Sequence, residues 1–186
     1  MSIDILEKLR GKKKEGFTLV ETLIALFILT VGVGGAFGLI HQTISYMAFA
    51  QNRLVASYLA QEGIEIVRNI RDENFLKIHY GGDIDWLEGI GCEGGGGCQV
   101  DYRDTSLRAF ENNPLHISSK DGERGFFIQP VSGDLIHNPT PSIFTREITI
   151  NPVQDAGEEK VEVTATVSWS RYDVQVSTEL HKWLGE

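Results

Sequence analysis

Glu21 places a carboxylate inside a long apolar run. The run covers residues 17 to 40 and closely follows the lysines at residues 12–14. At about 1.5 Å per helical residue, it is long enough to cross a hydrocarbon core of about 30 Å. A carboxylate in that core costs about 2.5 to 3.5 kcal/mol, so an ordinary membrane anchor does not carry one. Glu21 is therefore a candidate for specific ion-pair chemistry.

The apolar run also admits two routine interpretations. A secretory signal would end at a small-residue cleavage site, for which residues 36–38 (Ala-Phe-Gly) are a candidate. A plain signal anchor would be oriented by the basic residues on its cytoplasmic side. Neither interpretation accounts for Glu21. A buried helix of a soluble domain is excluded because the run has no polar face before its glycines.

The sequence GFTLVE at residues 16–21 follows lysines and opens the apolar run. This combination resembles the processing site of type IV prepilins and pseudopilins. The resemblance implies that a prepilin peptidase cuts between Gly16 and Phe17 on the cytoplasmic face and then methylates the new amino group of Phe17. Residues 1–16 would be the discarded leader. Glycine leaves the scissile bond unobstructed, and a cut before the apolar run keeps the anchor attached.

The same resemblance makes Glu21 an assembly residue. The free amino group of Phe17 in a neighbouring subunit would pair with the Glu21 carboxylate, because two charges that are unfavourable alone in lipid become favourable together. The alternative is that Glu21 only extends to the nearby cytoplasmic interface.

The composition describes an acidic chain of one domain plus an anchor. The 186 residues carry a formal charge of −9. Without the leader, 12 basic and 23 acidic residues remain, a charge of −11. Such a charge opposes nucleic-acid binding by the domain as a whole. No nucleophile, metalloprotease or phosphate-loop motif occurs, and the five histidines are scattered, so we expect no enzyme, catalytic residue, metal site or cofactor.

Cys92 and Cys98 are the only cysteines and are six residues apart. If the domain is exported, an oxidising compartment favours a disulfide between them, worth roughly 2.4 kcal/mol in the chain-entropy view. Two free thiols remain the alternative. A metal site is the least favoured, since no histidine stands at a zinc spacing from the pair.

The apolar run is expected to continue as a long helix. Residues 17–40 form its membrane and assembly part, and residues 41–79 form an amphipathic part. The stripe that defines the second part consists of Ile44, Ala48, Val55, Leu59, Ile66 and Ile70. Four glycines between residues 32 and 38 each cost about 1 kcal/mol of helix propensity, so the helix should be weakest there. The family often has a proline near this place, where this sequence has Gly38.

Residues 80–186 are expected to form a β-rich head. Glycine-rich residues 80–97 predict a loop, and residues 125–129 predict a short strand after a turn at residues 119–122. Phe144, Ile148 and Ile150 alternate in a further strand that Arg146 interrupts. The clearest strand covers residues 160–170, and a turn near residues 171–173 leads to a second strand through Leu180. This hairpin should cover the helix stripe in an α+β fold.

Two other segments carry a weaker resemblance. The segments AQEGIEIVRNIRD at residues 60–72 and TVSW at residues 166–169 are similar to stretches of V-type minor pilins and I-type minor pseudopilins. The simpler interpretation of the first is a solvated face with pairs such as Glu65 with Arg68 or Asn69.

The sequence therefore predicts a structural minor pilin-like subunit. Its expected partners are other pilin or pseudopilin subunits, the prepilin peptidase, an inner-membrane assembly platform and membrane lipid. It would cross the inner membrane once with its head outside the cytoplasm, then enter a pilus or pseudopilus at the cell surface. The alternatives are a type II secretion minor pseudopilin and a membrane-tethered adhesin or binding module.

Overall fold

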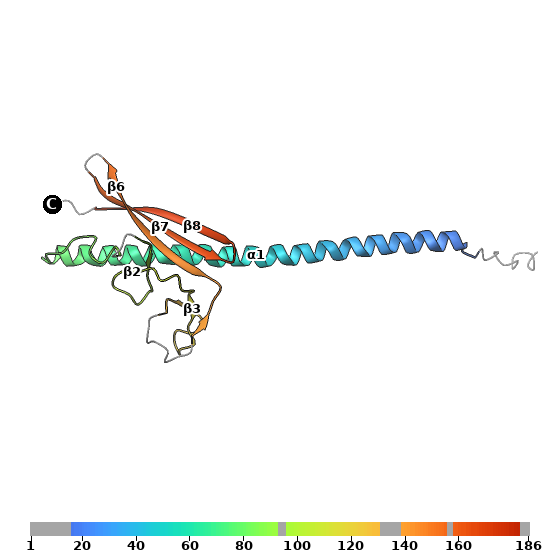
Figure 1. The fold of residues 1–186 in the computed structure, drawn as a ribbon, viewed down its shortest axis with the longest axis horizontal. Coiled ribbons are helices and arrows are strands. Elements are labelled where there is room, and N and C mark those ends of the chain that lie inside the picture. Colours follow the sequence, from blue (N-terminus) through green and yellow to red (C-terminus); the bar gives the residue numbers. More distant parts are fainter. Residues whose placement is uncertain (1–15, 93–95, 131–138, 156–157, 183–186) are drawn as a thin grey trace, which may run out of the picture. The chain divides into compact units, whose positions relative to one another are not determined.

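A computed structural model describes residues 16–92, 96–130, 139–155 and 158–182. The expected leader, residues 1–16, lies outside this description except for Gly16. The chain divides into two compact units, Met1–Ala48 and Phe49–Glu186. One helix, α1 (Leu19–His79), supplies residues to both units (Figure 1).

Hydrogen bonds at both ends of α1 explain why the helix begins and ends where it does. At its start, the Thr18 hydroxyl accepts the Glu21 N–H at 3.2 Å, which is the geometry of a helix N-cap. At its end, Gly81 has a φ of 88° and its N–H donates to Ile78 O at 2.9 Å. The Gly82 N–H donates to Lys77 O at 2.8 Å. These two bonds form a Schellman motif with glycine at the left-handed position.

The first unit consists, in its described part, of the apolar half of α1. This half contains a window with a mean hydropathy of 2.4, long and apolar enough to cross a membrane by length and composition. Its side chains are exposed throughout. The helix continues through Gly32, Gly34, Gly35 and Gly38, and an added Cβ at each would have open space around it.

The second unit is built on a five-stranded antiparallel sheet of order β2-β1-β6-β7-β8. Its long strands are β6 (Thr145–Asp155), β7 (Glu158–Trp169) and β8 (Tyr172–His181), with β1 (Cys98–Gln99) and β2 (Arg108–Ala109) at one edge. Alternate residues of β7 are buried, as their period of two predicts. These are Val161, Val163, Ala165, Val167 and Trp169.

The β7–β8 hairpin has a tighter turn than the sequence predicted. Trp169 pairs with Tyr172, so the turn consists of Ser170 and Arg171 rather than of residues 171–173. Ser170 has a φ of 54°. The favoured two-residue hairpin turns need a positive φ at their first position, and here Ser170 adopts it in place of the usual glycine.

A smaller sheet of order β4-β3-β5 is built from three two-residue strands. They are β3 (His116–Ile117), β4 (Phe127–Ile128) and β5 (Thr140–Pro141). The strand predicted at residues 125–129 is therefore present but reduced to β4. Pro141 is compatible with β5 because β5 lies at a sheet edge.

The core lies between the second half of α1 and the large sheet (Figure 1). The predicted stripe is confirmed in part: Leu59 and Ile70 are buried, and Val55 and Ile66 are half-buried and pack against the core. Ile44 and Ala48 are exposed and belong to the first unit. The buried residues of α1 also include small and apolar ones that the prediction left out: Ala56, Ala60, Gly63, Ile64, Val67, Asn74 and Phe75. Hydropathy alone gives small residues such as Ala60 and Gly63 little weight. The α+β fold class is confirmed.

Candidate processing and assembly site

Gly16 and Phe17 lie before the helix. Neither belongs to α1, and Thr18 caps the first turn after them. Both are exposed, and nothing lies within 4 Å of a Cβ built on Gly16. The peptide bond between them is thus outside regular helical hydrogen bonding, where a peptidase can bind it without first unwinding a turn.

Glu21 occupies the third position of α1, three residues after its cap. The Thr-x-x-Glu spacing is that of a capping box, and an anion in the first turn is favoured by the helix dipole. Its side chain is exposed and has no ion-pair partner among the residues that the structure describes. The carboxylate therefore has a local stabilising position in the helix and remains open to a partner. The sequence analysis missed the capping box, although its signal, Thr18 followed three residues later by Glu21, was present.

The helix around Glu21 presents large apolar side chains on all sides. They include Leu19, Val20, Leu23, Ile24, Leu26, Phe27, Ile28, Leu29, Val31, Val33, Phe37, Leu39 and Ile40. Such a helix must be covered by lipid or by other helices. Its open glycines allow another helix to approach closely.

Residues 11–37 match the family model described as the prokaryotic N-terminal methylation motif. These residues are a type IV prepilin-type N-terminus. This segment contains Gly16, Phe17 and Glu21, and it supports a type IV pilin-like or pseudopilin-like precursor. No curated protein and no solved structure matches the chain.

Cys92 and Cys98 form a disulfide, with their Cα atoms 5.8 Å apart. Cys98 is buried and begins β1, where it pairs with Ala109 on one side and Ile148 on the other. The bridge therefore fastens the end of the glycine-rich loop to the large sheet.

Arg146 forms a buried polar centre in the head that the sequence analysis missed. Its side chain is 1% exposed. It donates to Val100 O at 2.8 Å, to Leu59 O at 3.0 Å and to the Glu62 carboxylate at 3.2 Å. Burial lowers the pKa of Arg146, and the Glu62 and Asp101 carboxylates oppose that shift. The guanidinium thus joins the helix, β6 and the segment after β1.

A buried carboxylate, that of Asp101, joins the two sheets. Asp101 accepts the Gln129 N–H at 2.8 Å and an Arg103 guanidinium N–H at 2.9 Å, both on Oδ2. The Gln129 side chain donates to Gln99 Oε1 at 3.0 Å. This network holds the segment after β4 against the segment after β1.

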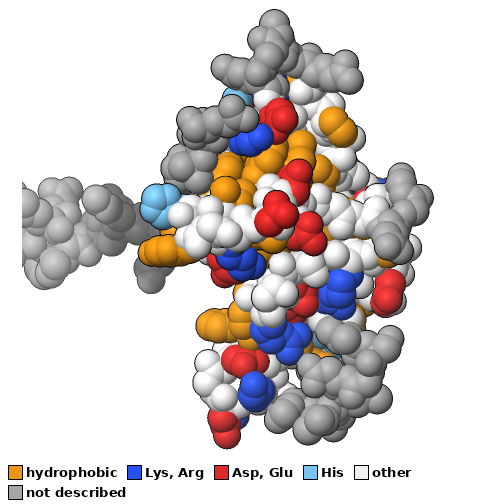
Figure 2. Space-filling view, turned by 90° about the vertical axis from the view of Figure 1, so that its left-hand side faces the viewer, with side chains coloured by type: hydrophobic (Ala, Val, Ile, Leu, Met, Phe, Trp, Pro, Cys, Tyr) orange, Lys and Arg blue, Asp and Glu red, His pale blue; other side chains and the backbone are white. Residues whose placement is uncertain are grey.

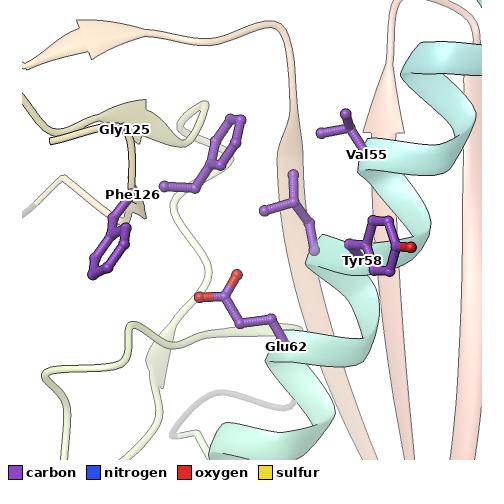
Figure 3. Close-up of a pocket in the computed structure, with 7 residues that line it drawn as sticks. Val55, Tyr58, Glu62, Gly125 and Phe126 are labelled. Atoms are coloured by element: carbon purple, nitrogen blue, oxygen red, sulfur yellow. The ribbon is translucent and has the colours of Figure 1, made fainter. Parts of the chain in front are cut away.

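A groove of about 400 Å³ lies between α1 and the β4 segment (Figure 3). Its walls are Val55, Tyr58, Leu59, Glu62, Gly125, Phe126 and Phe127. The Glu62 carboxylate projects from the helix toward the β4 side of the groove. Because Glu62 also pairs with Arg146, much of its charge is already balanced.

The remaining charged residues of the segment at residues 60–72 are partly explained. Arg68 pairs with Glu65, as predicted, and Arg71 pairs with Asp72 at 2.7 Å. Glu62 and Gly63 instead contact the interior of the head: Glu62 pairs with Arg146, and Gly63 packs against Ile148 and Arg146. Among the described residues, no group of three or more His, Cys, Asp or Glu side chains is arranged to hold a metal ion.

Proposed function

We propose that this chain is a structural minor pilin-like subunit of a type IV pilus or pseudopilus. The observation that carries the proposal is the prepilin-type segment at residues 11–37, which leads into a membrane-length apolar helix. The same helix supplies residues to the α+β head, and the side chains of its apolar half are exposed. The exposed apolar half is suited first to lipid and then to packing against other subunits.

In this function, prepilin peptidase cuts between Gly16 and Phe17 and methylates the Phe17 amino group. The position of the bond before the cap supports the cut. The subunit is then held in the inner membrane with its head outside the cytoplasm. An assembly platform there would move it into the filament.

The carboxylate of Glu21 gives assembly its specificity. It pairs with the Phe17 amino group of a neighbouring subunit and converts two unfavourable charges into one favourable contact. Its exposure supports this role. The first-turn position also stabilises the carboxylate before the neighbour arrives.

The assignment as a minor subunit rests on the resemblance at residues 60–72 and 166–169 to V-type minor pilins and I-type minor pseudopilins. The structure gives these segments a common location. Gly63 lies against Ile148 and Arg146, and Val167 and Trp169 are buried on the strand next to β6. A type II secretion pseudopilin would have the same construction and is the closest alternative.

A binding module is the second candidate, and the groove beside Glu62 favours it. In that function, the head recognises a ligand and filament entry is incidental. One experiment separates the two. The chain is expressed with and without prepilin peptidase, and sheared filaments are tested for the mature form.

We expect the mature chain as a scarce component of filaments only when the peptidase is present. Membrane-bound, processed chain that never enters filaments would contradict the structural role. Full-length chain in the presence of the peptidase would contradict the processing step itself.

A further inference from the structure

An aromatic cluster closes the β7–β8 end of the head. The Phe49 ring lies 4.9 Å from the Tyr172 ring and 6.2 Å from the Trp169 ring, and Phe144 lies 6.1 Å from Trp169. Trp169 is buried, but Phe49 and Tyr172 are 36% and 46% exposed. Ile143, directly before Phe144, is 59% exposed. This end of the head therefore presents three large apolar side chains, which we call the end patch: Phe49, Ile143 and Tyr172.

The end patch is accompanied by basic side chains. Arg171 forms the second position of the β7–β8 turn and is exposed, and Arg53 follows Phe49 by one helical turn and is also exposed. The acidic residue next to the patch is Asp173, whose side chain lies on the opposite face of β8 from Tyr172. The end of the head where α1 stops differs, because Figure 2 shows acidic and basic side chains interspersed there.

The length of the uncharged part of α1 relates this patch to a membrane. No Asp, Glu, Lys or Arg occurs between Glu21 and Arg53. The intervening 31 residues span about 46 Å as a helix, which matches the thickness of about 40 to 45 Å of a bilayer with its headgroups. Phe49 lies four residues before Arg53, at the end of that uncharged stretch.

We propose that the β7–β8 end of the head is a lipid-docking surface for anionic phospholipid headgroups. Phe49, Ile143 and Tyr172 lie among the headgroups, as aromatic and apolar side chains do at membrane interfaces. Arg171 pairs with lipid phosphate, and Arg53 adds attraction. This surface would hold the head in one orientation on the bilayer until the subunit leaves the membrane for the filament. This inference rests on the membrane anchoring of the proposed function and is independent of filament assembly.

The test uses the full chain in phospholipid nanodiscs that contain phosphatidylglycerol. A fluorophore is attached at Ser170→Cys, and a nitroxide on the lipid headgroup acts as quencher. The two native cysteines are joined in the disulfide, so labelling is confined to the new one. The control site is Tyr80→Cys, which is 84% exposed and directly follows α1. It lies 31 residues beyond Phe49, a distance of about 46 Å at the helical rise.

We expect strong quenching at position 170 and little at position 80. Arg171→Glu should lower the docking equilibrium constant by at least about fivefold, the factor expected for one basic residue near an anionic surface. Ile143→Ser should lower it as well. Arg124→Glu, the same charge change on the turn before β4, should leave quenching unchanged.

Equal quenching at positions 170 and 80, or none at 170, would overturn the proposal. So would strong quenching that ignores both Arg171→Glu and Ile143→Ser, because the tether alone would then explain proximity. A chain that does not enter the nanodiscs at all contradicts the anchoring in the proposed function. If the surface binds a second subunit instead of lipid, adding unlabelled chain would shield the label at position 170 and abolish its quenching by the headgroup nitroxide. That result would also overturn the proposal.

Discussion

The Arg146 guanidinium donates to the backbone carbonyl of Leu59 at 3.0 Å, across 87 positions of sequence. This bond ties the start of β6 to α1. The same guanidinium also donates to the Glu62 carboxylate, one helical turn further along α1, and to the carbonyl of Val100 after β1. The junction between helix and sheet is therefore polar at its centre and apolar around it.

Replacing Arg146 by alanine should strongly destabilise the head. The change removes the Arg146 bonds to the Leu59 and Val100 carbonyls and the pair with the partly exposed Glu62, and a buried group left unsatisfied costs about 1 to 3 kcal/mol. Thermal unfolding of the detergent-solubilised chain, followed by near-ultraviolet circular dichroism, measures the effect. Arg124→Ala removes an exposed pair with Asp121 and should change stability by less than about 1 kcal/mol. Similar losses for both variants would show that Arg146 is not a specific centre.

Gly63→Ala should destabilise the head even though alanine is the better helix former. A Cβ at this position would lie 2.9 Å from Ile148 Cδ1 and 3.0 Å from Arg146 Cδ. Overpacking of about 1 to 3 kcal/mol then outweighs the gain of about 1 kcal/mol in helix propensity. Gln61→Ala, on the exposed side of the same turn, is the control and should be nearly neutral. A higher melting temperature for Gly63→Ala would show that Ile148 moves aside without cost.

Much of the fold follows from patterns in the sequence, and the exceptions have physical causes. The strand alternation from Val161 to Trp169 specified β7 and its buried face because one side of the sheet is covered. The helix stripe was predicted only in part, because close packing also buries Ala60 and Gly63, which hydropathy does not favour. Short strands such as β4 depend on tertiary contacts, including the bond from Gln129 to Asp101, that no local pattern contains.

The candidate sites divide in the same way. The prepilin-type segment was predicted because its parts are contiguous, and residues 11–37 match the corresponding family model. Arg146 was taken as an interruption of an apolar strand. Its place in the alternation of Phe144, Ile148 and Ile150 was the available signal, but its partners Glu62 and Val100 come from distant segments.

Gly16→Val should leave full-length protein in the membrane. A branched side chain before the scissile bond obstructs the peptidase, whereas glycine offers open space there. Immunoblotting and amino-terminal sequencing of membrane fractions distinguish the two forms. Gly35→Val, inside the apolar part of α1, is the control and should be processed normally. A product of normal yield that begins at Phe17 in the Gly16→Val variant would exclude this cleavage site.

Cys98→Ser should loosen the loop before β1 without unfolding the head. The bridge closes a short loop, and its loss costs roughly 2.4 kcal/mol in the chain-entropy view. Non-reducing peptide mapping of wild-type protein should join Cys92 to Cys98, and hydrogen exchange should rise in the loop of the variant. Two alkylatable thiols in protein recovered from outside the cytoplasm would contradict the bridge there. Unfolding of the whole head in Cys98→Ser would contradict its local role.

Glu21→Val should separate membrane anchoring from assembly. Cleavage should continue, because the cut lies before the cap, and insertion should improve by about 2.5 to 3.5 kcal/mol, less about 0.3 to 1 kcal/mol of lost helix-dipole interaction. Filament entry should fall sharply, because the Phe17 amino group of a neighbour then has no carboxylate to pair with. Quantitative blots of sheared filaments against membrane fractions measure both effects.

Glu21→Gln decides which property of the side chain matters. Glutamine keeps the capping-box spacing with Thr18 and a side chain of the same length, but it removes the charge. If pairing with the Phe17 amino group drives assembly, Glu21→Gln fails to enter filaments as Glu21→Val does. If the capping box is the essential feature, Glu21→Gln assembles normally and Glu21→Val does not. Normal assembly of both variants would leave Glu21 with only an interfacial position, and the proposed pairing would be wrong.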